Sequence, residues 1–194
     1  MYTGWMQVGN QWKYYSQGTL KIYGKTFVDG EKVTGWLPLG NRWYYIANDD
    51  YMVTGYYKVG NSTYYFDESG LMKTGWFKIN GEDYYAASSG AIQAQWVKSL
   101  SNWYYVDVDG KMVTGYQTIN GAKYYFASSG LMQKDWFKIN GEDYYAASSG
   151  TIQAQWVKSG RNWYYVDTDG KMVTGDYIID GKVNRFDNQG LWMN

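Results

Sequence analysis

The stretch of sequence that decides the fold is Gly35-Trp36-Leu37-Pro38-Leu39-Gly40-Asn41-Arg42-Trp43-Tyr44-Tyr45. A Gly-Asn pair separates two short runs of bulky residues, and two-residue hairpin turns of types I′ and II′ require such dipeptides. Pairing outward from this turn places Trp36, Trp43 and Tyr45 on one face of a β-hairpin, because side chains alternate along each strand. Tyr44 then lies on the opposite face, which has the character of an ordinary packing surface.

This unit recurs every 20 residues from Trp36 onward, without insertions. Its first position is occupied by Trp36, Tyr56, Trp76, Trp96, Tyr116, Trp136, Trp156 and Asp176. A lone two-stranded hairpin is marginally stable, since it cannot bury its own face. Consecutive units must therefore stack, and the sequence predicts an all-β solenoid of tandem hairpins of about 20 residues each.

We predict a single repeat module over residues 1–194, with irregular repeats in 1–35, regular repeats in 36–175 and a degenerate C-terminal cap in 176–194. Degenerate terminal units are typical of capping repeats. A longer period is superimposed, because residues 76–115 and 136–175 are identical at all but four of 40 positions. The higher unit is therefore three hairpins, or 60 residues.

Composition narrows the classes of function. The chain has 18 basic and 18 acidic residues, so it has no basic excess for nucleic-acid binding. It has no His and no Cys, which excludes catalysis, metal ligation and disulfides that depend on them. We expect no cofactor. No apolar run approaches the ~20 residues of a membrane helix, so no membrane insertion is expected. Residues 1–5 do not form a signal peptide, and a signal would lie outside this sequence.

The aromatic content is high, with 11 Trp, 23 Tyr and 6 Phe in 194 residues. Full Trp pairs occur at Trp5/Trp12, Trp36/Trp43, Trp96/Trp103 and Trp156/Trp163. In the other units the second Trp is replaced, by Thr63, Asp83, Lys123, Asp143 or Val183. Electron-rich ring faces attract a quaternary ammonium, but the same rings also stack on sugars. The residues alone leave both ligands open, and the simplest alternative is that the rings are solenoid core.

Two kinds of acidic motif could suggest calcium binding or glycosidase catalysis, and their context argues against both. Asp107-x-Asp109 and Asp167-x-Asp169 resemble the start of a calcium loop, but the remaining ligands of that loop are missing, so we interpret them as turn residues. Glu82 and Asp83 are adjacent strand residues that point to opposite faces, so they cannot flank one glycosidic bond. The sequence therefore predicts a non-catalytic module.

The units quoted above resemble the choline-binding, or cell-wall-binding, repeats of surface proteins, autolysins and phage lysins of streptococci and relatives. The resemblance implies a left-handed superhelix with about three hairpins per turn, in which choline lies between consecutive hairpins. It further implies that each choline is boxed by the two Trp of one repeat and a Tyr of the next, with a Met nearby.

The site residues implied by this resemblance form four boxes. They are Trp36, Trp43, Tyr65 and Met72; Trp96, Trp103, Tyr125 and Met132; Trp156 and Trp163; and Trp5, Trp12 and Phe27. Tyr65 and Tyr125 are chosen because they share the Trp face, with Tyr64 and Tyr124 as alternatives. In the third box Arg185 stands where the Tyr is expected, which makes that site doubtful.

The resemblance implies binding of choline or phosphocholine on teichoic and lipoteichoic acids at the bacterial cell surface, for a secreted or phage-encoded protein. A murein hydrolase domain could be attached outside this sequence. The alternative is a glucan- or glycan-binding module, because residues 115–126 also resemble the glycan-binding repeats of clostridial toxins. The oligomeric state does not follow from the sequence.

Overall fold

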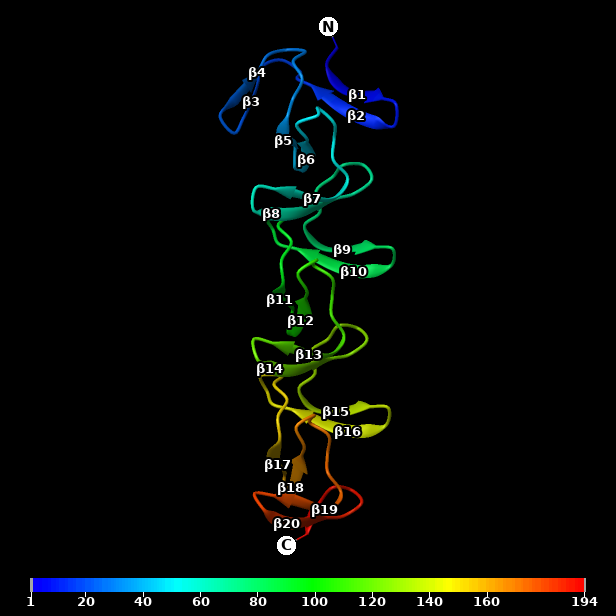
Figure 1. The fold of residues 1–194 in the computed structure, drawn as a ribbon, viewed down its shortest axis with the longest axis vertical. Coiled ribbons are helices and arrows are strands. Elements are labelled where there is room, and N and C mark those ends of the chain that lie inside the picture. The colour runs from blue at the N-terminus through cyan, green and yellow to red at the C-terminus, as the bar shows by residue number, and fades with distance from the viewer. Residues whose placement is uncertain (1, 194) are drawn as a thin grey trace. The chain divides into compact units, whose positions relative to one another are not determined.

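The computed structural model describes residues 2–193, and within them the regular elements are β-strands paired as antiparallel hairpins (Figure 1). This confirms the predicted all-β architecture of tandem hairpins. The chain forms two compact units. The first runs to Gln95 and includes Val106–Lys111, and the second comprises Trp96–Tyr105 and the chain from Met112 onward.

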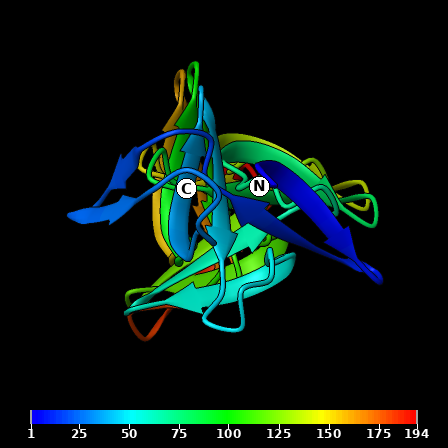
Figure 2. The same cartoon turned by 90° about the horizontal axis from the view of Figure 1, so that it is seen from above.

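The first unit contains five hairpins. Their strands are β1 (Gly4–Val8) with β2 (Gln11–Tyr15), β3 (Leu20–Ile22) with β4 (Lys25–Phe27), β5 (Gly35–Leu39) with β6 (Arg42–Ile46), β7 (Gly55–Val59) with β8 (Ser62–Phe66), and β9 (Gly75–Ile79) with β10 (Glu82–Ala86). Viewed along the stack, β1–β2 and β3–β4 extend in different directions (Figure 2).

The second unit contains the remaining strands, apart from the end residues Gln95 and Val106. They are β11 (Gln95–Ser99) with β12 (Asn102–Val106), β13 (Gly115–Ile119) with β14 (Ala122–Phe126), β15 (Asp135–Ile139) with β16 (Glu142–Ala146), β17 (Gln155–Ser159) with β18 (Asn162–Val166), and β19 (Gly175–Ile179) with β20 (Lys182–Phe186) and the short β21 (Trp192–Met193). Within this unit β19–β20 extends to the same side as β13–β14, three hairpins earlier, as the 60-residue period predicts (Figure 1). The left hand of the superhelix stays a prediction.

The predicted register is correct. Trp36 faces Tyr45 and Pro38 faces Trp43 across β5 and β6. The turn residues Asn80 and Gly81 both have positive φ, of 51° and 85°, as a type I′ turn requires.

A backbone hydrogen bond ties six of the connecting loops to an earlier hairpin, and in the regular repeats this is the hairpin before the one that the loop follows. We call the second Trp position of the repeat the wall position, and its carbonyl accepts the bond from a loop N–H. The pairs are Met52 to Trp12, Met72 to Trp43, Ile92 to Thr63, Met132 to Trp103, Ile152 to Lys123 and Met172 to Asp143, with N–O distances of 2.8–2.9 Å. The backbone at the wall position is therefore the same whatever side chain it carries.

The core lies between hairpins, because no single hairpin has an interior. The last residue of the second strand is fully buried in the regular hairpins, as in Ile46, Phe66, Phe126 and Val166. Each such aliphatic or Phe side chain contributes about 1.5–3 kcal/mol when removed from water. The apolar face predicted to pack does so, since Leu37 is fully buried and Tyr44 is 8% exposed.

Several turn glycines lie against the Met of an earlier loop, which leaves no room for a Cβ. A Cβ added to Gly90 would lie 2.5 Å from Met72 Sδ, and Gly90 has a φ of +83°. We expect Gly90→Ala to lower the free energy of unfolding by about 2–4 kcal/mol, from left-handed backbone strain and from overpacking. Gly75→Ala is the matched control, because Gly75 has a φ of +66° but no atom within 4 Å of an added Cβ. Denaturant unfolding of both variants checks this, and equal losses would contradict a steric role for Met72.

Candidate functional site: aromatic boxes between hairpins

The best-formed box lies in the second unit. The β11–β12 hairpin supplies Trp96 and Trp103, whose ring centroids are 6.3 Å apart with planes at 87°. Tyr124 of β14 packs on Trp96 at 4.9 Å and 71°. Met132 completes the box, and its N–H donates to the Trp103 carbonyl. These four side chains line a groove of about 580 Å³.

The structure corrects the predicted Tyr125 of this box. Tyr125 instead stacks on Phe137 at 5.5 Å and packs on Tyr116 at 4.9 Å. Within one hairpin the second Tyr shares a face with the Trp pair, and this alternation was the reason for predicting Tyr125. Stacking brings the Trp face of one hairpin against the opposite face of the next, so the first Tyr of the pair contacts Trp96.

The first-unit box around Trp36 repeats this geometry. Trp36 and Trp43 are 6.1 Å apart at 84°, and the next hairpin contributes Tyr64, at 4.8 Å from Trp36. The predicted Tyr65 stacks on Phe77 at 5.4 Å. The Met72 N–H donates to the Trp43 carbonyl at 2.9 Å, so the backbone of Met72 lies beside this hairpin.

A ring that the sequence argument missed also contacts this box. Tyr23, in the turn between β3 and β4, lies 6.2 Å from Trp43. Its side chain is 74% exposed and its φ is positive. The irregular hairpin has no place in the 20-residue alignment, so no periodic signal could have identified Tyr23.

The N-terminal box differs from the prediction in its third wall. Trp5 packs on Tyr44 at 5.2 Å, and Trp5, Trp12, Tyr44 and Met52 line a groove of about 330 Å³. The predicted Phe27 is 6% exposed and belongs to the hydrophobic core of the first unit. The irregular β3–β4 hairpin does not contribute the third wall of this box. The following regular hairpin, β5–β6, contributes it as Tyr44.

The C-terminal box has an altered third wall, as the sequence suggested. Trp156 and Trp163 are 6.4 Å apart at 86°. Arg185 forms an ion pair with Asp176 at 2.8 Å. Trp192 packs on Trp156 at 5.4 Å and 75°. Leu191-Trp192 occupies the repeat position of Leu131-Met132, so aligning the last unit would have identified it.

A hairpin with Asp at the wall position forms a different site. Trp136 packs on Tyr164 at 5.4 Å, and both line a smaller groove of about 260 Å³ with Asp143 and Met172. The Asp143 carboxylate lies 2.7 Å from Lys138 Nζ, its cross-strand neighbour. The carboxylate is therefore already compensated by an internal cation, which makes this groove a weaker site for an external one.

The two motifs that resemble the start of a calcium loop form turns in the structure. Asp107 Oδ1 accepts hydrogen bonds from the N–H groups of Asp109 and Lys111, and Asp167 does the same in the second unit. These Asp residues are turn caps, as predicted. Residues 2–193 contain no group of three or more side chains suited to hold a metal ion. In the same range no helix has the length and apolar character to cross a membrane.

A carboxylate supports the loop that carries Met72. Asp67 Oδ1 accepts hydrogen bonds from the N–H groups of Ser69 and Leu71 at 3.0 Å, and Lys73 Nζ lies 2.8 Å from Oδ2. Burial raises the pKa of Asp67, but the hydrogen bonds from Lys73, Ser69 and Leu71 together outweigh it and lower the pKa to about 2. The ionised carboxylate therefore stabilises the fold above pH 3.8 and ceases to do so as the pH falls through about 2.

We expect Asp67→Asn to lower the melting temperature at neutral pH. This deficit relative to the wild type should shrink as the pH falls from 3.8 to about 2, because the wild-type carboxyl is then protonated too. Thermal unfolding at a series of pH values measures it. Glu68→Gln, a change at an exposed neighbouring carboxylate, is the control and should show no such trend. A deficit that persists unchanged to pH 2 would contradict the role of the charge.

The chain matches two family models of repeat sequences. A family model described as a choline-binding repeat matches residues 33–74, 53–93 and 113–155, which together cover more than half of the chain. A second model, a putative cell wall binding repeat, matches residues 95–112 and 155–172. Comparison with curated protein sequences found no match to this chain.

Several solved structures are similar to the whole chain. CbpF in complex with ipratropium is 26% identical with a TM-score of 0.70, over 95% of this chain and 76% of that one. The choline-binding domain of CbpL from Streptococcus pneumoniae is 24% identical with a TM-score of 0.63, over 100% and 98%. The modular autolysin LytC of the same organism is 22% identical with a TM-score of 0.60, over 99% of this chain but 48% of its own length. The last two share the fold of tandem hairpins.

Proposed function

Since this chain belongs to the family of choline-binding repeats, we propose that it is a non-catalytic module that binds choline of teichoic and lipoteichoic acids and so anchors a protein to the bacterial cell surface. The observation that supports the ligand is the box of Trp96, Trp103, Tyr124 and Met132. Perpendicular rings present their electron-rich faces to one space, which suits a trimethylammonium group that has no hydrogen bond to donate.

Each box is expected to bind weakly. A cation–π contact contributes about 0.5–2 kcal/mol, and the loss of translational freedom offsets much of the total. We expect a Kd near 1 mM for free choline, equivalent to about −4 kcal/mol. A polymer that carries many cholines engages several boxes at once, so avidity supplies the strength of anchoring.

The four Trp pairs supply the sites of this proposal. In the regular part of the chain they recur every 60 residues, at Trp36, Trp96 and Trp156. Sites that recur regularly along the chain suit a polymer whose choline groups are themselves regularly spaced. The boxes of Trp5, Trp36 and Trp96 would bind choline with Tyr44, Tyr64 and Tyr124 as third walls. In the box of Trp156, Trp192 would take the place of the Met.

The alternative ligand is a glycan. The groove beside Trp96 is larger than a trimethylammonium group needs, and Asn102, Gln133, Ser148 and Ser149 also line it. Hydroxyl and amide groups of this kind hydrogen-bond sugars, whose apolar faces would stack on the indole rings. Choline remains the preferred ligand because the perpendicular rings leave little flat area for a sugar ring.

Trp103→Ala should remove one equivalent of bound choline while the fold survives. Trp103 is 40% exposed and forms one wall of one box, so its loss changes little of the core. Trp136→Ala is the matched control, because Trp136 lines the same groove as Asp143, in a hairpin without a Trp pair. Calorimetric titration gives the stoichiometry of each variant. An equal loss of choline equivalents in both would show that the Asp-bearing groove binds choline as well.

Choline should also raise the melting temperature, since it binds residues of two neighbouring hairpins in the folded state only. Choline at about 100 times its Kd should stabilise one site by about 2.7 kcal/mol. Glucan oligosaccharides at the same concentration are the comparison. A shift with sugar and none with choline would favour the glycan alternative.

Retention of the protein on a tertiary-amine resin in about 1 M NaCl would exclude simple ion exchange, because salt screens the attraction between exposed charges.

A further inference from the structure

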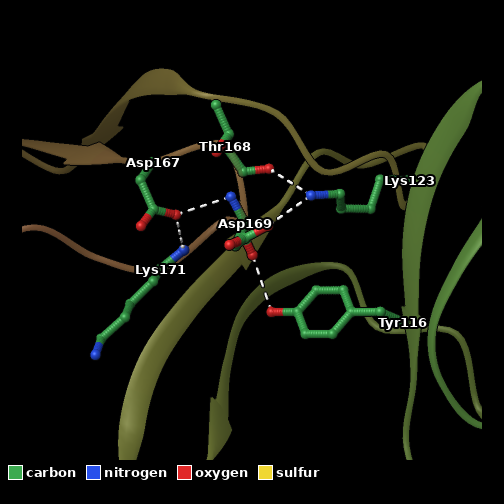
Figure 3. Close-up of polar contacts among 6 residues, drawn as sticks. All are labelled: Tyr116, Lys123, Asp167, Thr168, Asp169 and Lys171. Carbon is green, nitrogen blue, oxygen red and sulfur yellow. Dashed lines mark hydrogen bonds and ion pairs between the residues drawn. The ribbon is translucent and has the colours of Figure 1, made fainter.

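A second kind of site occurs in two copies that differ at the wall position. The cross-strand neighbour of that position also differs, being Lys58 beside Thr63 and Thr118 beside Lys123. The copy in the second unit is formed by Tyr116 and the loop 167–171, with Lys123 at the wall position (Figure 3). Tyr144, which pairs with Lys171 of that loop, lies beside it. The copy in the first unit lies between Tyr56, Tyr84 and the loop 107–111, with Thr63 at the wall position. Neither has a Trp pair, so neither belongs to the boxes described above.

The two copies have the same backbone. The wall-position carbonyl accepts the N–H of Ile92 in one copy and of Ile152 in the other, at 2.8 Å in each. The Tyr85 N–H donates to Gly110, and the Tyr145 N–H to Gly170, again at 2.8 Å. The two loops are identical except that Val108 stands in the place of Thr168.

The tyrosine walls are also equivalent. Tyr56 donates its hydroxyl hydrogen to the Asp109 carbonyl at 3.0 Å, and Tyr116 donates to the Asp169 carbonyl at 2.9 Å. Burial, followed by the neighbouring tyrosine and Asp109, raises the pKa of Tyr56 to about 12, so this phenol remains a neutral donor at physiological pH. The contacts of Lys123 in the second copy therefore indicate where an ammonium group would lie in the first copy.

In the second unit an ammonium group occupies the site. Lys123 Nζ donates to the Thr168 carbonyl at 3.2 Å and to Asp169 Oδ1 at 2.5 Å (Figure 3). This arrangement uses the N–H donors of a primary ammonium, which a quaternary ammonium does not have. Lys123 thus shows which ligand chemistry this backbone and loop can hold.

In the first unit the same place is open. A pocket of about 340 Å³ is lined by Tyr56, Tyr84, Asp107, Asp109 and Lys111, and the wall-position Thr63 does not line it. Asp107 is engaged by backbone N–H groups, and Lys111 is paired with Glu82 at 2.9 Å. Within residues 2–193 the Asp109 carboxylate has neither a hydrogen bond nor an ion pair, and the residues that line the pocket include two carboxylates and one ammonium group.

We propose that the pocket beside Thr63 binds a primary alkylammonium group, such as the side chain of a lysine in a partner peptide. The ammonium would take the place that Lys123 Nζ has in the second unit, between the carbonyl of Val108 and the carboxylate of Asp109. The alkyl chain would lie along the rings of Tyr56 and Tyr84. The site discriminates against choline because three methyl groups cannot donate to either oxygen.

The test exchanges the wall residues of the two copies. The probe is n-butylammonium, the fragment of a lysine side chain, followed by amide NMR titration with tetramethylammonium as the quaternary control. In the wild type, n-butylammonium should shift the amide signals of 107–111 saturably. Thr63→Lys should abolish these shifts, and Lys123→Thr should create a second saturable set at 167–171.

Asp109→Asn provides a further variant that leaves the loop backbone intact. It should weaken n-butylammonium binding by about tenfold or more, since it removes one charge-assisted hydrogen bond. The proposal is overturned if the wild type shows no saturable shifts, if they persist in Thr63→Lys, or if tetramethylammonium binds equally well. None of these variants lies in a Trp-pair box, so choline titration of the same samples separates this proposal from the choline proposal.

Discussion

The structure depends on the contact between one hairpin and the next. A hairpin of two five-residue strands has no interior, so its apolar residues leave water only when another hairpin covers them. The hydrogen bond from a loop N–H to the wall-position carbonyl fixes that contact at the same point in successive repeats. Folding and the formation of the boxes are therefore one event, because the rings that form a box come from two hairpins.

A constant backbone with a variable side chain explains why the repeats differ chemically. The wall position carries Trp103, Asp143, Lys123 or Thr63 without a change in its hydrogen bond to the following loop. Trp completes a box of rings, and Asp is paired with the neighbouring Lys138. Lys fills the site with its own ammonium group, while Thr leaves it open. The side chain at the wall position is thus one determinant of what each unit can hold.

The same arrangement limits the affinity of any single site. The rings of the boxes are partly exposed, with Trp103 and Trp163 at 40%, so a bound cation stays near water. Ring faces exposed in this way contribute less than fully desolvated ones. In the function proposed above, repetition compensates for this, since each further box would add an intramolecular contact to a polymer already bound. A long series of shallow sites suits attachment to a repetitive surface better than capture of a free small molecule.

The sequence by itself determined everything that depends on neighbours along the chain. The turn dipeptides and the two-residue alternation were sufficient for the hairpins, their register and the Trp pair of each box, as in Trp36 and Trp43. Only the tertiary structure decided which ring closes each box. Tyr124 rather than Tyr125, Tyr44 rather than Phe27, and the added Tyr23 and Trp192 all come from a different hairpin or from the final strand. The reason is physical: alternation specifies the face of a residue within its own hairpin, whereas the rotation between hairpins, which selects the opposing face, is set by how their buried side chains pack.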